Sequence, residues 1–313
     1  MYIANPIYDV VFKYLMEDAK VAKLLISSII GEEIEELDFR PQEFTTDIDK
    51  SILEGRTGTL TVYRLDFSAK IKTETGSKNV IIEIQKAKFA TDIMRFRSYL
   101  GNQYSDTGST QSVTINNQTR SIGIPLIGIY FLGHKLDHND SAVIGVKRTY
   151  TDLITGEELT TKETFIESLT HDSYVIQIPH LTKKRRNELE TLLGLFDQSL
   201  SVDTTHHILN VKEDDFPDKF RPLIRRLQMA VSESEMRKQM TLEDGILADF
   251  EEMQREIEVY KQKTAEAEQK TAEAEKAIEE EKQKTAEAEQ NVIKARQESE
   301  ELRRRLEELE NRR

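Results

Sequence analysis

The sequence has no cysteine and no tryptophan among its 313 residues. Without cysteine the chain cannot form a disulfide framework, a thiolate zinc site or a cysteine nucleophile, so any metal must be held by carboxylate, histidine or carbonyl groups. Long apolar runs are also lacking, since stretches such as 124–133 are far shorter than a membrane span. The opening MYIANPIYDVVF has no basic segment before an apolar run. We therefore expect a soluble, cytoplasmic protein of about two structural units, with no membrane partner and no secretory signal.

Basic residues are in deficit, with 44 Lys and Arg against 57 Asp and Glu, which gives a net charge of −13. An evenly spread deficit would argue against nucleic-acid binding, because phosphate is neutralised by Lys and Arg. The charge is not evenly spread: residues 241–313 carry 22 acidic and 14 basic side chains, a net charge of −8, which leaves −5 for residues 1–240. The overall charge therefore does not exclude a nucleic-acid partner for the first 240 residues.

Glycine and proline are absent after Gly245, so nothing breaks a helix over the last 68 residues. The string QKTAEAE occurs there three times, at 262–268, 269–275 and 283–289. A repeat of seven residues is the period of a coiled coil. With position a placed at Phe250, the a and d positions are apolar at both ends of the tail and small in its middle.

The charges that flank this a/d seam are complementary. In a parallel, in-register pair, each g residue faces the following e residue of the partner helix. Six of the eight such pairs are opposite in sign and none is like-charged. We predict a homodimer through a parallel coiled coil over 250–310. The alternatives are a solvated single helix of Glu and Lys, or a slippage repeat without a partner.

The first 240 residues alternate between helix and strand patterns, which is typical of the α/β and α+β classes. Asn5-Pro6 predicts the start of a helical segment, with apolar spacing that continues to a stop at Gly31. Period-two alternation predicts a hairpin of strands 60–72 and 79–86 with a turn at 73–77. The other predicted elements are a helix from about Thr91, a buried strand over 123–133, a polar hairpin with its turn at Thr155-Gly156, a strand over 173–179, an amphipathic helix over 183–200 and another helix over 217–240.

Two carboxylates face each other if the first hairpin turns about 73–76. Asp66 then pairs with Glu83 across the strands, with Cβ atoms about 5 Å apart. Facing carboxylates repel, and a divalent cation such as Mg²⁺ between them reverses that effect. Gln85 shares the face of Glu83, where its amide can orient a water or a phosphate oxygen, while Lys86 starts on the opposite face. The alternative is that both carboxylates are simply solvated on the polar face of the hairpin.

The string D66-(x)16-E83-I-Q85 on adjacent strands resembles the PD-(D/E)XK nuclease superfamily. It is most similar to the PD-(D/E)XK nuclease family transposases, which are related to recombination-promoting nucleases and commonly have Gln as the last motif residue. The opening NPIYDVVFKYLM resembles the D-x-x-F-K segment of this branch, with Asp9, Phe12 and Lys13 at the motif positions. The resemblance covers about residues 1–200.

This resemblance implies a restriction-endonuclease-like PD-(D/E)XK core, an α/β (α+β-like) fold with a mixed central sheet, over 1–200. An inserted hairpin at about 140–166 interrupts it, and a helical extension over 201–242 and the coiled-coil tail over 243–313 follow. The resemblance also implies that Asp66 and Glu83 hold Mg²⁺, or Mn²⁺ in its place, for phosphodiester hydrolysis. Gln85 takes the place of the superfamily Lys but cannot supply its positive charge. Lys86 or another base would then have to take over the role of that lysine. Asp9 and Lys13 would be accessory residues of the first helix.

Two groups of basic residues are candidates for contact with phosphate. The first follows the hairpin and consists of Lys86, Lys88, Arg95 and Arg97, with Tyr99 on the helix face of Arg95. The second stands at a predicted helix start and consists of Lys183, Lys184, Arg185 and Arg186, where the helix dipole does not favour basic residues. His206 and His207 are expected at the surface.

The function implied is a Mg²⁺-dependent DNA endonuclease related to transposition or recombination. One alternative is a nuclease-fold protein that has little or no catalytic activity and acts as a coiled-coil module binding DNA or protein. A nuclease toxin or defence effector would have the same chemistry as the endonuclease.

Overall fold

The computed structural model describes residues 1–40, 67–74, 76–86, 92–115, 117–181, 185–202 and 204–310 of the chain. Within these ranges, the structure shows the side chains of all residues except Asp92, Arg95, Ile115, Phe250 and 306–310. The chain divides into two compact units, Met1–Gly245 and Ile246–Arg313. No helix in the described ranges is both long enough and apolar enough to cross a membrane.

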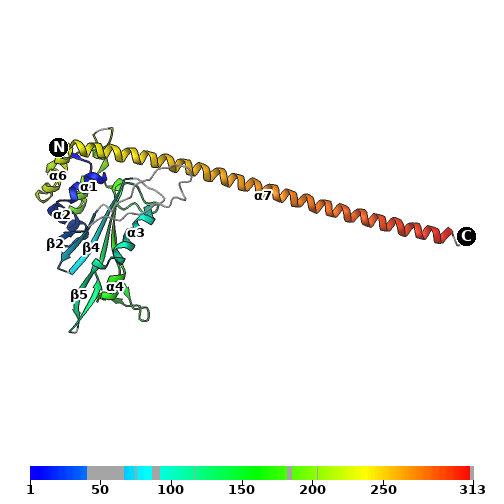
Figure 1. The fold of residues 1–313 in the computed structure, drawn as a ribbon, viewed down its shortest axis with the longest axis horizontal. Coiled ribbons are helices and arrows are strands. Elements are labelled where there is room, and N and C mark those ends of the chain that lie inside the picture. Colours follow the sequence, from blue (N-terminus) through cyan, green and yellow to red (C-terminus); the bar gives the residue numbers. More distant parts are fainter. Residues whose placement is uncertain are drawn as a thin grey trace. The chain divides into compact units, whose positions relative to one another are not determined.

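A six-stranded mixed sheet forms the centre of the first unit (Figure 1). In spatial order its strands are β2 (Glu36–Phe39), β3 (Phe67–Thr73), β4 (Gly76–Gln85), β7 (Leu126–Leu132), β11 (His171–Gln177) and β8 (Val143–Val146). The three middle strands β4, β7 and β11 run parallel, and the outer strands pair antiparallel. The sheet confirms the expectation of a mixed α/β fold with a mixed central sheet.

The hairpin of β3 and β4 has the register that the alternating pattern predicts. Phe67 pairs with Ile82, and the pairing continues to Thr73 opposite Gly76. The predicted turn and register are therefore confirmed for the described residues. Asp66 and the earlier part of the predicted strand lie outside the described residues.

One face of the sheet is covered by the two helices of the N-terminal segment. Helix α1 (Asp9–Met16) and helix α2 (Ala19–Ile30) are separate, because the Asp18 side chain accepts hydrogen bonds from the first turn of α2 and begins a new helix there. The predicted stop is confirmed, since Gly31 ends α2 in the left-handed conformation at φ 74°. The predicted start is wrong: α1 begins at Asp9 and not at Pro6, because the Asn5 side chain bonds to Gln198 and to the His206 carbonyl.

Three packed aromatic rings join α1 and the 3-10 turn Gly194–Phe196 to the sheet. Phe131 of β7 lies 5.6 Å from the ring centre of Phe12 and 4.7 Å from that of Phe196. All three rings are 0% exposed. Since Phe131 pairs with Ile84 of β4, this is the face of the sheet that carries the even-numbered residues of β4.

Helix α3 (Asp92–Ser105) covers the opposite face, which carries Ile81, Glu83 and Gln85. Tyr99 of this helix packs in a small buried cluster with Ile81 and Leu126. The ring of Phe96 lies 5.3 Å from the ring of Tyr130 on β7. The two faces of β4 therefore meet different helices, α1 on one side and α3 on the other.

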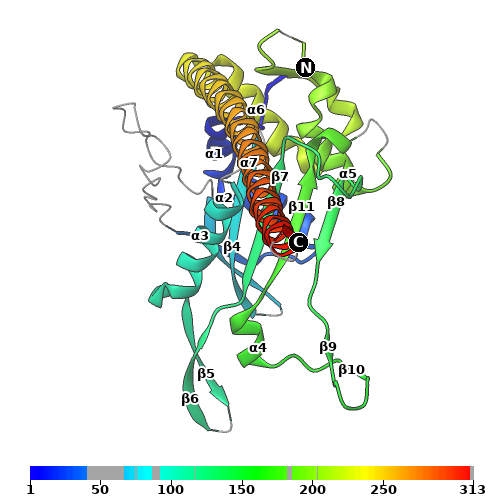
Figure 2. The same ribbon diagram turned by 90° about the vertical axis from the view of Figure 1, so that its right-hand side faces the viewer.

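Two hairpins extend from the amino-terminal ends of the parallel strands (Figure 2). They are β5 (Thr110–Ile115) with β6 (Gln118–Gly123), and β9 (Tyr150–Thr151) with β10 (Glu158–Leu159), which precedes helix α4 (Thr164–Leu169). The second hairpin confirms the predicted turn at Thr155-Gly156, with Gly156 at φ 78°. The first hairpin is not in the prediction.

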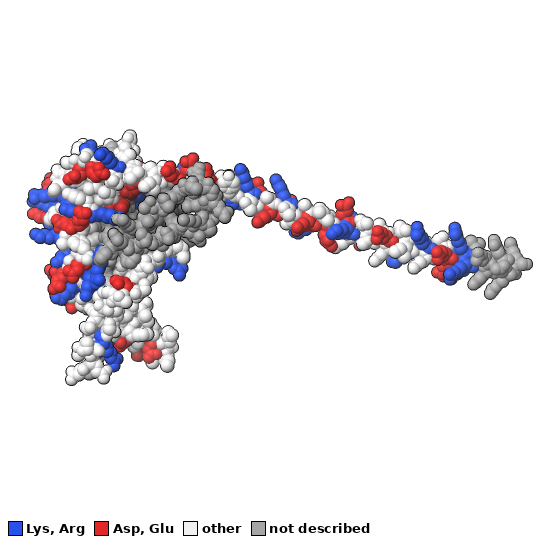
Figure 3. All heavy atoms as spheres, viewed as in Figure 1, with Lys and Arg blue, Asp and Glu red and all other residues white. Residues whose placement is uncertain are grey.

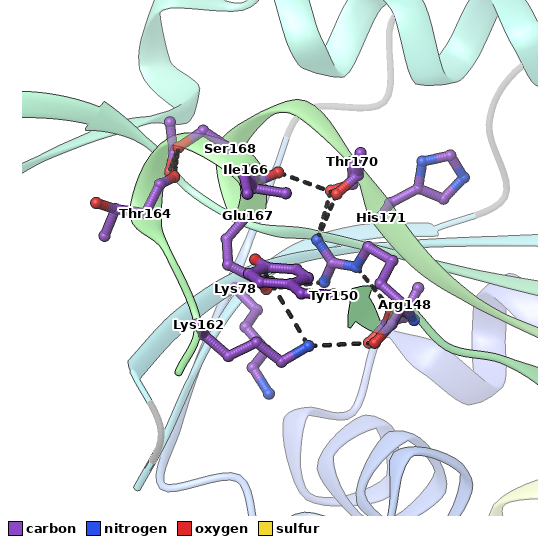
Figure 4. A network of polar contacts seen from close by, with 12 residues as sticks. Lys78, Arg148, Tyr150, Lys162, Thr164, Ile166, Glu167, Ser168, Thr170 and His171 are labelled. Atoms are coloured by element: carbon purple, nitrogen blue, oxygen red, sulfur yellow. Dashed lines mark hydrogen bonds and ion pairs between the residues drawn. The ribbon is translucent and has the colours of Figure 1, made fainter. Parts of the chain in front are cut away.

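Arg148 ties the inserted segment to the sheet. Its guanidinium donates to Asp172 of β11 at 2.8 Å and pairs with Glu167 of α4 at 3.0 Å (Figure 4). It also donates to the hydroxyl and carbonyl of Thr170. Because burial of a guanidinium is costly unless it is paired, this network explains how a polar insertion is held in place.

The predicted helix over 183–200 is wrong in its length. Within the described residues 185–200, only α5 (Glu188–Leu193) is an α-helix, followed by 3-10 turns over Gly194–Phe196 and Gln198–Leu200. The predicted single helix over 217–240 is also wrong, since α6 (Arg221–Ser232) ends at Glu233 in an extended conformation and α7 (Ser234–Glu310) begins after it. Strand β12 (Ile208–Asn210) pairs with β1 (Tyr2–Ala4) and joins the two ends of the first unit.

The second unit, Ile246–Arg313, is helical throughout its described residues, as part of α7. Acidic and basic side chains alternate along its surface (Figure 3). The a and d residues Tyr260, Ile278, Val292 and Leu302 are between 54% and 69% exposed in the single chain. The long helix predicted from the composition is confirmed.

Candidate functional site

The candidate site lies at the carboxyl end of β4. Glu83 and Gln85 are two residues apart on one face of this central strand, and each is only 4% exposed. Both acid and amide are therefore held in the sheet rather than on a solvated hairpin face. Sites of open sheets with parallel strands lie at this carboxyl end.

Tyr130 is the neighbour of Glu83 on β7 and faces the same side. Its ring leans back over Gly128, where a Cβ would come within 2.8 Å of the tyrosine hydroxyl. Burial, with smaller contributions from the negative charges of Glu83 and Tyr104, raises the pKa of Tyr130 to about 12. Tyr130 is thus a neutral phenol at physiological pH.

Gln85 differs from the glutamine that occupies the equivalent place on β11. Gln177 is fully buried, donates to the carbonyls of Asn139 and Ser141, and accepts from the backbone of Leu136. Neither the oxygen nor the nitrogen of the Gln85 amide has a hydrogen-bond partner within the described part of the chain. A buried amide without partners costs free energy, so its hydrogen-bonding capacity is consistent with a ligand that binds there.

The donor atoms of this site are oxygens, which suit Mg²⁺ or Mn²⁺ better than a soft metal. Glu83 supplies a carboxylate and Gln85 an amide oxygen, so the residues present fit the implied ion. No group of three or more acidic or histidine side chains that could hold a metal gathers within the described ranges. Asp66 and Lys88 lie outside those ranges.

Lys86 points to the other face of β4 and belongs to a different cluster. Its ammonium forms an ion pair with Asp244 near the start of α7 and lies 3.7 Å above the ring of Tyr8. Two further groups contact the Asp244 carboxylate: His207 Nε2 at 2.8 Å and the Tyr8 hydroxyl at 3.0 Å. Because Lys86 points away from Glu83 and is engaged by Asp244 and Tyr8, its position argues against Lys86 as the base of the site.

Asp9 and Lys13 form an ion pair of 2.7 Å within α1. The backbone amide of Asp9 donates to the Glu243 carboxyl at 3.1 Å, which joins α1 to the start of α7. Burial and then the negative charge of Asp9 raise the pKa of Glu243 to about 8, against the opposing effect of Lys86. Asp9 therefore contacts α7 through its backbone amide and pairs with Lys13 through its side chain.

Glu243 makes the stability of the first unit depend on pH. In the folded chain it keeps a proton that the unfolded chain releases above about pH 4.5, so the free energy of unfolding falls as the pH rises from there to about 8. One proton gives a slope of at most about 1.4 kcal/mol per pH unit. We expect Glu243→Gln to remove this contribution, measured as the difference between wild-type and variant urea unfolding at pH 5 to 9. A difference that stays constant over this range would contradict the assignment.

The residues predicted to contact phosphate differ in what the structure shows of them: one is exposed, several lie outside the described part, and two are paired with acidic residues. Arg97 is exposed on α3, while Lys88, Lys183 and Lys184 and the side chain of Arg95 lie outside the described part. Arg186 pairs with Glu190, whose pKa is lowered by that hydrogen bond, and Arg185 lies 3.6 Å from Asp197. These two arginines are already engaged within the fold, which explains basic residues at the start of α5.

Two predictions at this site are corrected by burial. Tyr99 of α3 is 1% exposed and packs against Ile81 and Leu126, so its ring is not available to a nucleic acid. His207 is 7% exposed and bonded to Asp244, although the sequence predicts a surface histidine. His206 is exposed, as predicted.

A cavity of about 460 Å³ lies at the opposite, amino-terminal ends of the parallel strands. Its charged lining is balanced: Lys78 pairs with Glu32, and Arg148 pairs with Glu167 and Asp172. The charges of these five residues are therefore paired within the fold.

No protein-family model matches the chain, and the comparisons with curated proteins and with solved structures find no significant similarity. The resemblance to nucleases therefore remains a prediction that the sequence motifs carry.

Proposed function

We propose that this protein is a Mg²⁺-dependent DNA endonuclease of PD-(D/E)XK type, related to transposition or recombination. The observation that carries the proposal is the pair of Glu83 and Gln85, buried on one face at the carboxyl end of β4, with the Gln85 amide without a hydrogen-bond partner within the described part of the chain. Asp66 immediately precedes Phe67, the residue that pairs with Ile82 next to Glu83. The motif spacing and the confirmed register support the proposal together.

In this proposal each residue has a limited role. Glu83 and Asp66 hold the ion by their carboxylates, and Gln85 orients the attacked phosphate or the attacking water by hydrogen bonds. Bound Mg²⁺ supplies Lewis acidity and lowers the pKa of a water molecule. Tyr130, neutral and next to Glu83, packs against the carboxylate without competing for the ion.

The experiment is cleavage of supercoiled plasmid by the full chain with Mg²⁺ and with EDTA, together with calorimetric titration of Mg²⁺. We expect nicked or linear DNA only with the metal, and loss of both cleavage and metal binding in Asp66→Ala and Glu83→Ala. Arg120→Ala, on the exposed β6, is the matched control. Equal cleavage by the parent and by both acid variants would refute the site.

We also propose that the chain forms a parallel homodimer through 250–310. The a and d side chains Tyr260, Ile278, Val292 and Leu302 are exposed in the single chain, and the helix leaves nearly all its e and g charges without ion pairs along the described part of the tail, apart from Arg305 with Glu301. Those charges are therefore available to a partner helix, and a dimer would join two single-cut sites. This observation also favours the alternative function, a coiled-coil module that binds DNA or protein without cutting.

We expect Ile278→Lys with Val292→Lys to convert the dimer to a monomer, because both a residues would place charge in the buried seam. The change leaves the single chain intact, since the two side chains are 54% and 55% exposed there. Val259→Lys with Ile293→Lys is the matched control, because these aliphatic residues are 48% and 56% exposed but lie off the seam. Light scattering should give twice the 36.2 kDa chain mass for wild type and control. A wild-type mass of one chain would end the dimer proposal.

A further inference from the structure

Asp244 stands where four segments that are distant in the sequence meet. Lys86 follows β4, Tyr8 precedes α1, His207 precedes β12, and Asp244 lies in the part of α7 that belongs to the first unit. The carboxylate receives hydrogen bonds from all three side chains. Burial alone would raise the pKa of Asp244, but the hydrogen bonds from Lys86, His207 and Tyr8 outweigh it and lower that pKa. Asp244 is therefore an anion at neutral pH.

Two of these partners are fixed parts of the core. Tyr8 is 0% exposed, and its ring packs edge-on against His207 with 5.1 Å between ring centres. The backbone of Asn5 donates to the His207 carbonyl at 2.9 Å, beside the β1–β12 pairing. The position of the Asp244 carboxylate is thus set by rigid neighbours, independently of Lys86.

Lys86 in turn transmits this position to the end of β4. Its own carbonyl packs so closely on Gly133 that a Cβ there would overlap it. The amide of Gly133 donates to the Gln85 carbonyl at 2.6 Å. The backbone of Gln85 and Lys86 is therefore held by Gly133 on one side and, through the lysine ammonium, by Asp244 and the Tyr8 ring on the other.

We infer that Asp244 is a positioning residue for the nuclease site: it anchors Lys86 and thereby sets where Gln85 presents its amide on the other face of β4. The inference rests on the proposed function for its effect on DNA cleavage. It assigns to the start of α7 a part in the site that the Glu-x-Gln motif alone does not contain. It also gives Lys86 the role of a tether in place of that of a base.

The test combines turnover with a double-variant cycle. In plasmid cleavage we expect Asp244→Asn to lower kcat by roughly 10- to 100-fold with little change in KM, because small displacements of a reacting geometry cost about that much. Asp244→Glu, which keeps the charge, should lose less. Asp249→Asn changes an exposed residue of the same helix and should cleave like wild type.

The cycle needs no nuclease activity. We expect Asp244→Leu and Lys86→Met each to lower the urea midpoint of unfolding, and the double variant to lower it by clearly less than the sum, because both remove the same tie. Additive shifts would overturn the tether. Coupled shifts with an unchanged kcat in Asp244→Asn would overturn its role in the site. If Glu83→Ala still cleaves like wild type, the proposed function fails, whatever the cycle gives.

Discussion

Replacing Glu83 by Gln should lower the rate of DNA cleavage by at least about 10³-fold if Glu83 holds Mg²⁺ as proposed, because that carboxylate would then contribute several kcal/mol of transition-state stabilisation. The amide has nearly the size and shape of the acid, so packing beneath α3 is kept. The measurement is single-turnover cleavage of a labelled duplex at saturating Mg²⁺.

Two further measurements separate chemistry from folding. The amide keeps the size of the acid at a position that is 4% exposed, so the variant should still unfold cooperatively in urea, and its midpoint shows whether slow cleavage comes from unfolding. Excess Mn²⁺ tests whether weaker metal binding is the cause, because it should recover part of the rate. A variant that cleaves within a few-fold of wild type would remove Glu83 from the site.

Replacing Phe131 by Ala should destabilise the first unit by about 3–5 kcal/mol, the range for deleting a buried aromatic ring. The ring is 0% exposed and packs against those of Phe12 and Phe196, whose centres lie 6.4 Å apart, so no single neighbour can fill the space. Urea unfolding followed by circular dichroism of the chain measures the loss.

Phe165→Ala is the matched control for Phe131→Ala, because Phe165 on α4 is 70% exposed. Its effect should stay within about 0.5 kcal/mol, as for most surface substitutions. Equal losses in the free energy of unfolding for the two variants would mean that burial of Phe131 among the other two rings adds no stability.

The sequence predicts well those features that a local repeat determines. Alternation along β3 and β4, with the turn between them, gives their register, because a slip of one residue would move every side chain to the other face of the sheet. The buried run of β7 and the long helix after Gly245 follow in the same way from strand and helix patterns. Where a single capping residue decides, as Asp18 does between α1 and α2, the apolar spacing continues across the break and conceals it.

The contacts of the candidate site depend on residues that are distant in the sequence. Lys86 and Asp244 are separated by 158 positions, so no local pattern relates them. Tyr99 has the spacing of a helical residue on the same face as Arg95, but tertiary packing buries it between α3 and the sheet, against Ile81 and Leu126. The sequence identifies Glu83 and Gln85 as chemically suited residues, and only the fold shows which of their neighbours share their face of β4.

Gln85 also bears on why this part of the fold is not built for maximum stability. An apolar residue at the same buried position would leave no amide unsatisfied among the described residues, and its neighbour on the sheet, Leu132, has such a side chain. Natural chains tend to give up stability at positions that serve binding or catalysis. Variants selected only for thermal resistance would thus be expected to lose this glutamine early, and the loss would mark the cost that function imposes on the sheet.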